Sequence, residues 1–199
     1  MAALRLHTVV ILLAAVLALS ACGDKSSPAQ TFENTDITGL GYAQDFSLYD
    51  ASGKLRTLAD FRGKAVVVFF GYTQCPDVCP TTMVEMAQVM KKLGPDADKV
   101  QVLFITLDPE RDTAEVLRQY VPAFDPRFIG LRGDEAQTQK VAQDFKVFYQ
   151  KVQGKTPGSY TLDHTAGTYV FDPQGRVRLF IHYGQPVDAV VHDLKILLS

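Results

Sequence analysis

The chain has 199 residues, a length that suits one domain of ordinary size with a short leader. Because 47% of the residues are hydrophobic and 21% are charged, the chain can bury a sizeable core, which excludes wholesale disorder. Twenty basic residues against 22 acidic ones give a net charge of −2, so the positive field that non-specific nucleic-acid binding requires is absent. We therefore expect one folded domain without a nucleic-acid partner.

The first 21 residues predict an export signal. Arg5 precedes an apolar run over residues 8–21, which is shorter than a comfortable membrane span. The run ends in Leu19-Ser20-Ala21-Cys22, which resembles the bacterial lipobox, where the cysteine becomes the lipidated first residue of the mature chain. We predict a lipoprotein-type signal peptide over residues 1–21 and lipidation at Cys22. Ordinary cleavage after Ala21, or an uncleaved anchor, is the alternative.

Residues 22–36 are predicted to be the lipidated cysteine followed by a flexible tether. The segment is polar, is interrupted by Pro28, and shows the period of neither a helix nor a strand. The remaining residues, 37–199, form the predicted domain. A lipid anchor would place that domain on the periplasmic side of a bacterial membrane.

The first part of the domain predicts a hairpin, a buried strand and a helix. Residues 46–49 and 55–58 flank a turn, which indicates a hairpin. Residues 65–70 are all apolar and rich in valine, and a run without alternation is typical of a central strand covered on both faces. Apolar residues at helical spacing over 80–93 then predict a helix that Gly94-Pro95 ends.

The second part predicts more strands and helices in turn. Asp112 with Glu115, and Asp134 with Gln137, resemble capping boxes that open helices reaching about residues 121 and 145. The charged segment 108–112 is interpreted as a loop that is either solvated or the lead-in to the first of these helices, with contact to a partner as the alternative. The other expected elements are strands at 100–107 and 128–131, a hairpin of 168–171 and 176–181, and a helix at 187–198.

This order of elements predicts an α/β fold. Strand, helix and strand followed by an antiparallel hairpin and a last helix describe a mixed sheet between helices. We expect a thioredoxin-like fold, with a mixed central sheet flanked by helices, a terminal β-hairpin and a C-terminal helix.

Cys75 and Cys79 follow the buried strand, at the point where the next helix begins. Amides and the dipole at a helix N-terminus favour thiolates, so we expect pKa values below the usual 8.5 or so, although Asp77 opposes the shift. If the segment is helical, a spacing of four puts both sulfurs on one face, where they bind one ion or form a disulfide. A purely structural disulfide is the alternative. For so short a loop, the chain-entropy model gives it only about 2 kcal/mol.

Two thiolates favour Cu(I), zinc or iron–sulfur chemistry. A cluster needs more cysteines, and a closed zinc site needs two histidines besides the cysteine pair, whereas Cu(I) accepts three ligands. His192 is expected on a solvated helix face, and His182 ends a predicted strand. His164 lies in a predicted loop that could fold over the cysteine pair. The residues themselves prefer His164 only weakly as the third ligand.

Three stretches resemble the Sco/SenC copper proteins of bacteria and mitochondria. They are residues 71–82 with both cysteines, residues 106–113, and Asp163-His164 followed by residues 169–173. The resemblance implies a thioredoxin-like fold and copper, as Cu(I) with Cu(II) as the second state, bound by Cys75, Cys79 and His164. It further implies a role in assembling the dinuclear copper centre of cytochrome c oxidase. The implied partners are the copper-receiving oxidase subunit and other periplasmic copper carriers or thiol reductants.

The functional hypothesis is therefore a membrane-tethered periplasmic copper metallochaperone. A thiol–disulfide reductase that keeps acceptor cysteines reduced is the alternative, with Cys75 attacking and Cys79 resolving. A peroxiredoxin is less favoured, because Val68 and Tyr72 stand where the usual proline and threonine lead-in would be. One departure from the family is the leader, since many relatives carry a membrane-spanning helix where this chain has a lipoprotein-like signal.

Overall fold

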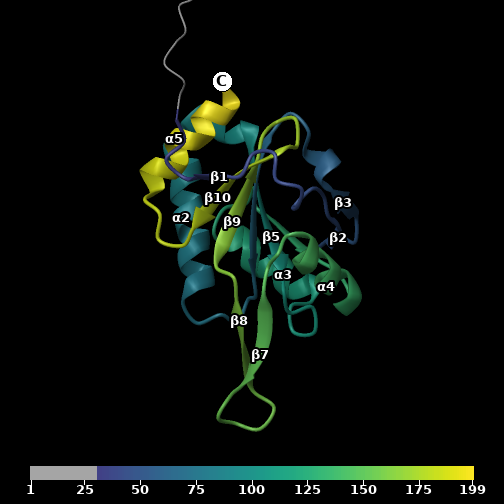
Figure 1. Ribbon diagram of the computed structural model, residues 1–199. Helices are drawn as coiled ribbons and strands as arrows, with labels where there is room; N and C mark the ends of the chain where they lie inside the picture. Colours follow the sequence, from purple (N-terminus) through teal and green to yellow (C-terminus); the bar gives the residue numbers. More distant parts are fainter. Residues whose placement is uncertain (1–30) are drawn as a thin grey trace, which may run out of the picture. The chain divides into compact units, whose positions relative to one another are not determined.

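The computed structural model describes residues 31–199, of which Phe32–Ser199 form one compact unit (Figure 1). The predicted signal peptide and Cys22 lie outside the described residues. Among residues 31–199 there is no helix with the length and apolar character needed to cross a bilayer.

A mixed sheet of eight strands forms the centre of this unit. Its strand order is β1-β10-β9-β4-β5-β6-β2-β3, and the neighbours β4, β5 and β6 run parallel while the other pairs are antiparallel. The strands are β1 (Thr35–Asp36), β2 (Ser47–Asp50), β3 (Leu55–Thr57), β4 (Ala65–Gly71), β5 (Val100–Thr106), β6 (Ile129–Arg132), β9 (Gly167–Phe171) and β10 (Val177–His182). The predicted mixed sheet and terminal hairpin are thereby confirmed.

Strands β4 and β5 form the core of the sheet because every one of their residues is buried. They pair in parallel from Ala65 opposite Val100 to Gly71 opposite Thr106. A strand without polar alternation must be covered on both faces, which is what the sequence indicated for residues 65–70.

The helices are α2 (Val78–Leu93), α3 (Ala114–Tyr120), α4 (Glu135–Asp144) and α5 (Val187–Leu198). Helices α2 and α3 lie on one face because right-handed crossovers join β4 to β5 and β5 to β6 in the same direction across the sheet. Helix α5 packs along α2 (Figure 1). The other face meets the end of α4, where Phe70 and Phe145 have ring centroids 5.1 Å apart.

A separate two-stranded sheet projects from the body between α4 and β9 (Figure 1). It consists of β7 (Tyr149–Gln153) and β8 (Tyr160–His164), paired from Tyr149 opposite His164 to Gln153 opposite Tyr160. The sequence predicted a loop around His164, which was wrong, because that residue ends a strand. The β7–β8 hairpin carries one of the candidate site residues.

One of the two predicted capping boxes is confirmed and the other is wrong. Asp134 and Gln137 cap α4 reciprocally, at distances of 2.8 and 2.9 Å. In contrast, Thr113 caps α3, while Asp112 is fully buried and accepts hydrogen bonds from Thr73 and Thr106. Residues 108–112 do lead into α3, but they are not solvated throughout, because Asp108 is only 1% exposed while Glu110 lies on the surface.

The start of the described chain is bound to the domain. The backbone N–H groups of Glu33 and Asn34 donate to the carboxylate of Asp193 on α5, at 2.9 and 2.8 Å. Strand β1 then adds to the edge of the sheet beside β10. The domain limits expected from the sequence, residues 1–21, 22–36 and 37–199, remain predictions.

Candidate metal centre

The two cysteines sit on either side of the point where α2 begins. Cys75 lies in the loop between β4 and α2 and is half-buried, whereas Cys79 is the second residue of the helix and is buried. Both are free thiols, and the backbone N–H of Cys79 points at Sγ of Cys75 over 3.4 Å. The sulfurs are therefore brought together by the loop folding back on the first helical turn, and not by a shared helix face.

Gly71 makes room for the sulfur of Cys79. A Cβ atom at this position would lie 2.9 Å from Sγ of Cys79 and 2.9 Å from the ring of Phe69. Real Cβ atoms do not approach other heavy atoms so closely, so any larger residue would displace the sulfur or the ring. The end of β4 and the first turn of α2 can pack this tightly only around a glycine.

His164 reaches the cysteines from the end of β8. Its Nε2 lies 3.5 Å from Sγ of Cys79, and its Nδ1 lies 3.0 Å from the backbone carbonyl oxygen of Thr165. A carbonyl oxygen only accepts hydrogen bonds, so in the neutral ring Nδ1 carries the proton and Nε2 keeps its lone pair toward the sulfur. The edges of the Tyr72 and Phe69 rings enclose the imidazole, with centroid distances of 6.0 and 6.4 Å.

The ligand atoms of Cys75, Cys79 and His164 all lie within 4.8 Å of one another, and they form the only such cluster among the described residues. A metal bound about 2.3 Å from each sulfur in a trigonal arrangement holds its donors about 4 Å apart. If the distances between the donor atoms shortened by less than about one ångström, all three donors could therefore bind one ion. The donor set of two sulfurs and one imidazole suits soft or borderline ions.

Burial controls the protonation of the site. Burial raises the pKa of the Cys79 thiol well above its usual range, and it lowers the pKa of His164. The expectation of a lowered pKa for Cys79 was wrong, because the cost of removing the thiolate from water outweighs the favourable helix N-terminus. Without a cation the site holds a neutral thiol and a neutral imidazole, and metal binding must displace the thiol proton.

The cluster opens to the surface. A hollow of about 370 Å³ is bordered by the cysteine loop on one side and by β8 on the other, and its lining includes Cys75 and His164. Asp77 and Asp163 stand exposed beside these residues. A donor group from another molecule can therefore approach Cys75 and His164, while Cys79 stays in the interior.

The other two described histidines lie elsewhere. His182 ends β10 on the surface, with its ring against Phe180. His192 is half-exposed on α5, next to Asp193 and Glu33. Neither belongs to the cluster.

Sequence reasoning missed Gly71 and the buried carboxylates of the 107–112 loop. Asp108 and Asp112 accept hydrogen bonds from groups on the hairpin and on the cysteine loop. The available signal for these buried carboxylates was a charge-rich loop that directly follows a buried strand and has acidic residues on both sides of Pro109. The composition of this loop equally suits a solvated turn.

Fold and cluster together define a thioredoxin-like protein with a two-thiol, one-imidazole site of the kind that binds soft metal ions. Residues 35–199 match the model of the SCO1/SenC family, and the chain belongs to that family. It is 40% identical to a SCO2-like protein of Rickettsia felis over 152 residues, which are 76% of this chain and 74% of that protein. It is 39% identical to the mitochondrial SCO2 homologue of Bos taurus over 169 residues, 84% of this chain and 62% of the bovine protein. The chain thus spans less than two thirds of that relative.

Solved structures of relatives share the fold. The Bradyrhizobium japonicum ScoI structure with copper bound superposes with a TM-score of 0.71 at 43% identity, over 77% of this chain and 98% of that one. The apo Sco1 protein of Thermus thermophilus gives a TM-score of 0.76 at 42% identity, over 86% of this chain and 100% of that one. The predicted thioredoxin-like fold is confirmed by these similarities.

Proposed function

We propose that the chain is a copper metallochaperone that carries copper as cargo on Cys75, Cys79 and His164. The observation that carries the proposal is the convergence of these three donors at a rim that is open to the surface. Support comes from family membership and from relatives described as copper-bound in B. japonicum, Arabidopsis thaliana and yeast. The role in assembling the dinuclear copper centre of cytochrome c oxidase follows from the motif resemblance, as does delivery to the copper-receiving subunit.

The geometry suits a carrier that must release its metal. Three ligands leave coordination positions free, so a donor atom of the acceptor can bind the copper before the carrier's own ligands leave. Cys75 and His164 face the opening and would be the first to exchange, while buried Cys79 keeps hold of the ion. The thiolates favour Cu(I), and Cu(II) is the second state.

Copper binding by the full chain tests the proposal. The reduced protein, purified without oxygen and given Cu(I), is expected to hold one copper per chain, and Cys75→Ser and Cys79→Ser are expected to lose it. Cys22→Ser is the matched cysteine control, because the proposal gives that residue no part in binding copper. Retention of stoichiometric copper by either cluster variant contradicts the proposal.

A thiol–disulfide reductase remains the second candidate, because Cys75 and Cys79 are both free thiols and their sulfur atoms lie within 4.8 Å of each other. In that reaction Cys75 attacks an acceptor disulfide, Cys79 closes an internal disulfide, and the acceptor leaves as two thiols. His164→Ala separates the two functions: a metallochaperone loses activity, whereas a dithiol reductase largely keeps it.

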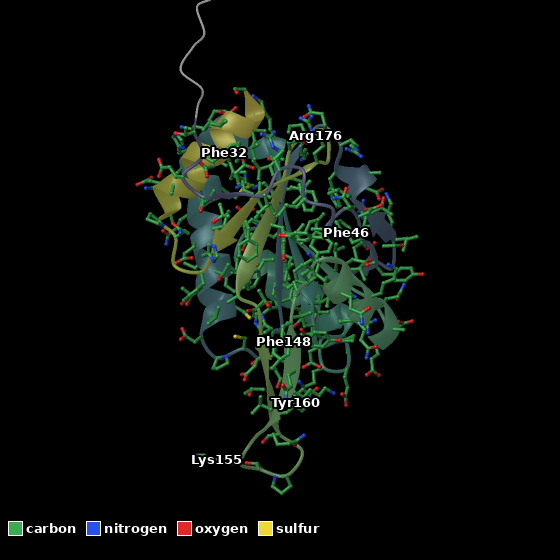
Figure 2. The ribbon with its side chains drawn as sticks, viewed as in Figure 1. Phe32, Phe46, Phe148, Lys155, Tyr160 and Arg176 are labelled. Atoms are coloured by element: carbon green, nitrogen blue, oxygen red, sulfur yellow. The ribbon has the colours of Figure 1, made fainter. Side chains whose placement is uncertain are left out.

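We further propose that residues 1–21 are a lipoprotein signal peptide, that lipidated Cys22 and the tether predicted over residues 22–36 anchor the protein, and that the domain faces the periplasm. Residues 33–36 at the end of this predicted tether are bound to the domain. Figure 2 shows Phe32 and Tyr160 near opposite ends of the domain, so the chain enters the domain at the end away from the β7–β8 hairpin. In fractionated bacterial cells, the wild-type chain is expected with the membranes, and Cys22→Ser with the soluble periplasmic proteins. A membrane-bound Cys22→Ser variant would contradict the lipid anchor.

A further inference from the structure

We infer that Arg111 is a positioning residue that fixes the β7–β8 hairpin, and with it His164, against the cysteine loop. The inference rests on the proposed copper function. Its starting point is that β7 and β8 form a sheet of their own, outside the eight-stranded sheet. A lone two-stranded hairpin is marginally stable at best. The position of His164 therefore depends on what ties this hairpin to the body.

The guanidinium of Arg111 joins three segments of the chain. Nη1 donates to the backbone carbonyl oxygen of Tyr160 at 2.8 Å, where β8 begins, and to Oε1 of Gln74 at 3.1 Å, directly before Cys75. Nε donates to Oδ2 of Asp108 within its own loop. The guanidinium carbon also lies 3.6 Å from the centroid of the Tyr160 ring, in a cation–π contact. One side chain thus connects the hairpin, the cysteine loop and the 107–112 loop.

Asp108 completes the connection from the other side. Its carboxylate is 1% exposed, and its Oδ1 accepts a hydrogen bond from the Tyr160 hydroxyl at 2.9 Å. A buried carboxylate needs a paired cation, which Arg111 supplies. Asp108, Arg111 and Tyr160 therefore form a closed ring of contacts, in which the arginine holds both the backbone and the side chain of Tyr160 in place.

Asp112 fixes the cysteine loop to the same segment. It accepts hydrogen bonds from the backbone N–H and the hydroxyl of Thr73, at 3.0 and 2.6 Å, and from the hydroxyl of Thr106 at 2.6 Å. The 107–112 loop is consequently the common support of both ligand-bearing segments: Asp112 holds the side with the cysteines, and Arg111 holds the side with His164. The exposed pair of Lys151 and Glu110 adds little, because surface ion pairs are weak.

Lysine could not replace the arginine fully. The contacts to Tyr160 O and Gln74 come from Nη1, and the contact to Asp108 comes from Nε, of one planar group that also lies over an aromatic ring. The ammonium group of lysine carries the same charge, but it lacks the fixed set of N–H donors and the planar surface of a guanidinium. Arg111→Lys is therefore expected to fall between the wild type and Arg111→Met.

Cu(I) affinity of the full chain, measured by competition with a Cu(I) chelator without oxygen, tests the inference. Arg111→Met is expected to bind copper roughly tenfold more weakly, the lower end of what loss of a supporting contact costs at metal sites. Arg118→Met is the matched control, because Arg118 pairs with Glu115 on the exposed face of α3, and it is expected to bind like the wild type. Tyr160→Leu, which keeps the Arg111 and Asp108 pair, is expected to shift affinity in the same direction, and it decides the matter if Arg111→Met fails to fold.

A double-mutant cycle separates positioning of His164 from a general structural role. If Arg111 acts through the imidazole, adding Arg111→Met to His164→Ala is expected to cost little further affinity. If the tenfold loss persists in the His164→Ala background, or if both Arg111→Met and Tyr160→Leu bind copper like the wild type, the inference is overturned.

A metal-free measurement keeps this inference apart from the proposed function. In the reduced apo protein, NMR cross-relaxation between the His164 and Tyr72 rings, whose centroids are 6.0 Å apart, is expected to weaken in Arg111→Met and not in Arg118→Met. Unchanged cross-relaxation in Arg111→Met overturns the inference. If the wild type binds no copper while the cross-relaxation still depends on Arg111, the copper function fails and the positioning role stands.

Discussion

The imidazole Nε2 of His164 lies 3.5 Å from the Sγ of Cys79, although 85 positions separate the two residues in the chain. Each reaches the contact by a different route: Cys79 by starting a helix after a buried parallel strand, and His164 by ending a strand of a projecting hairpin. The donors therefore depend on two supports that can be perturbed separately.

Replacing His164 by alanine is expected to weaken Cu(I) binding by about 10- to 100-fold while leaving the fold intact, because the two sulfurs remain and the half-buried ring leaves only a small void at the surface. Competition titration measures the affinity, and circular dichroism checks the fold. His192→Ala, on α5 and outside the cluster, is expected to match the wild type. Equal affinities for the two variants would remove His164 from the site.

The raised pKa of the Cys79 thiol predicts that copper affinity depends on pH. At neutral pH this thiol is protonated, and copper must displace the proton, so raising the pH favours the bound state. We expect apparent Cu(I) affinity to rise by about tenfold per pH unit for each proton released between pH 6 and 8. Titrations at three pH values in that window, corrected for the competitor's own protonation, measure the slope. A flat profile would mean that the thiol is already ionised.

Gly71→Ala is expected to destabilise the protein by about 1–3 kcal/mol and to weaken copper binding, because its Cβ would overlap the sulfur of Cys79 and the ring of Phe69. Gly41→Ala is a suitable control, since a Cβ there meets nothing within 4 Å. Urea denaturation gives the free energy of unfolding for both variants. Equal stabilities would show that the end of β4 tolerates a side chain.

Much of the fold could be predicted from the sequence because its signals are local. The all-apolar run of β4, the Asp134–Gln137 capping box and the turn between β9 and β10 depend on neighbours in the chain, and all three appear in the structure. The capping role expected for Asp112 failed because long-range partners, Thr73 and Thr106, compete successfully for its carboxylate. The spacing of residues along the sequence cannot reveal that a distant side chain competes for the same carboxylate.

The site was harder to predict than the fold. The spacing of Cys75 and Cys79 and their place after a buried strand indicate a site in the sequence. In contrast, nothing near His164 in the chain indicates that its segment pairs with residues 149–153. Strand β7 reads Tyr-Gln-Lys-Val-Gln, mostly polar and mostly exposed, so it lacks the alternation that marks a half-buried strand. The Cys79 pKa was misjudged for a similar reason, since burial is a property of the whole fold.

Asp193 anchors the start of the domain, and its ionisation makes that anchor depend on pH. Burial alone would raise its pKa, but hydrogen bonds from Glu33, Asn34 and His192 outweigh this effect and lower the pKa below the usual value. A carboxyl group with a lowered pKa in the folded state stabilises the fold above its unfolded pKa of about 3.9 and loses that contribution as the pH falls through the folded value. Asp193→Asn is therefore expected to lower the free energy of unfolding by about 2 kcal/mol at pH 7.

The difference between Asp193→Asn and the wild type is expected to shrink as the pH falls below about 4, where the carboxyl group of the unfolded chain takes up a proton, and to be lost below the lower pKa of the folded state. Chemical denaturation at pH 7, 5 and 3 measures it. Asp188→Asn provides the control on the same helix, because Asp188 pairs with Lys92 on the surface with 79% of its side chain exposed, and such a pair contributes about 1 kcal/mol at most. A loss for Asp193→Asn that is equally large at every pH would show that shape and hydrogen-bond count, and not charge, hold residues 33 and 34 on α5.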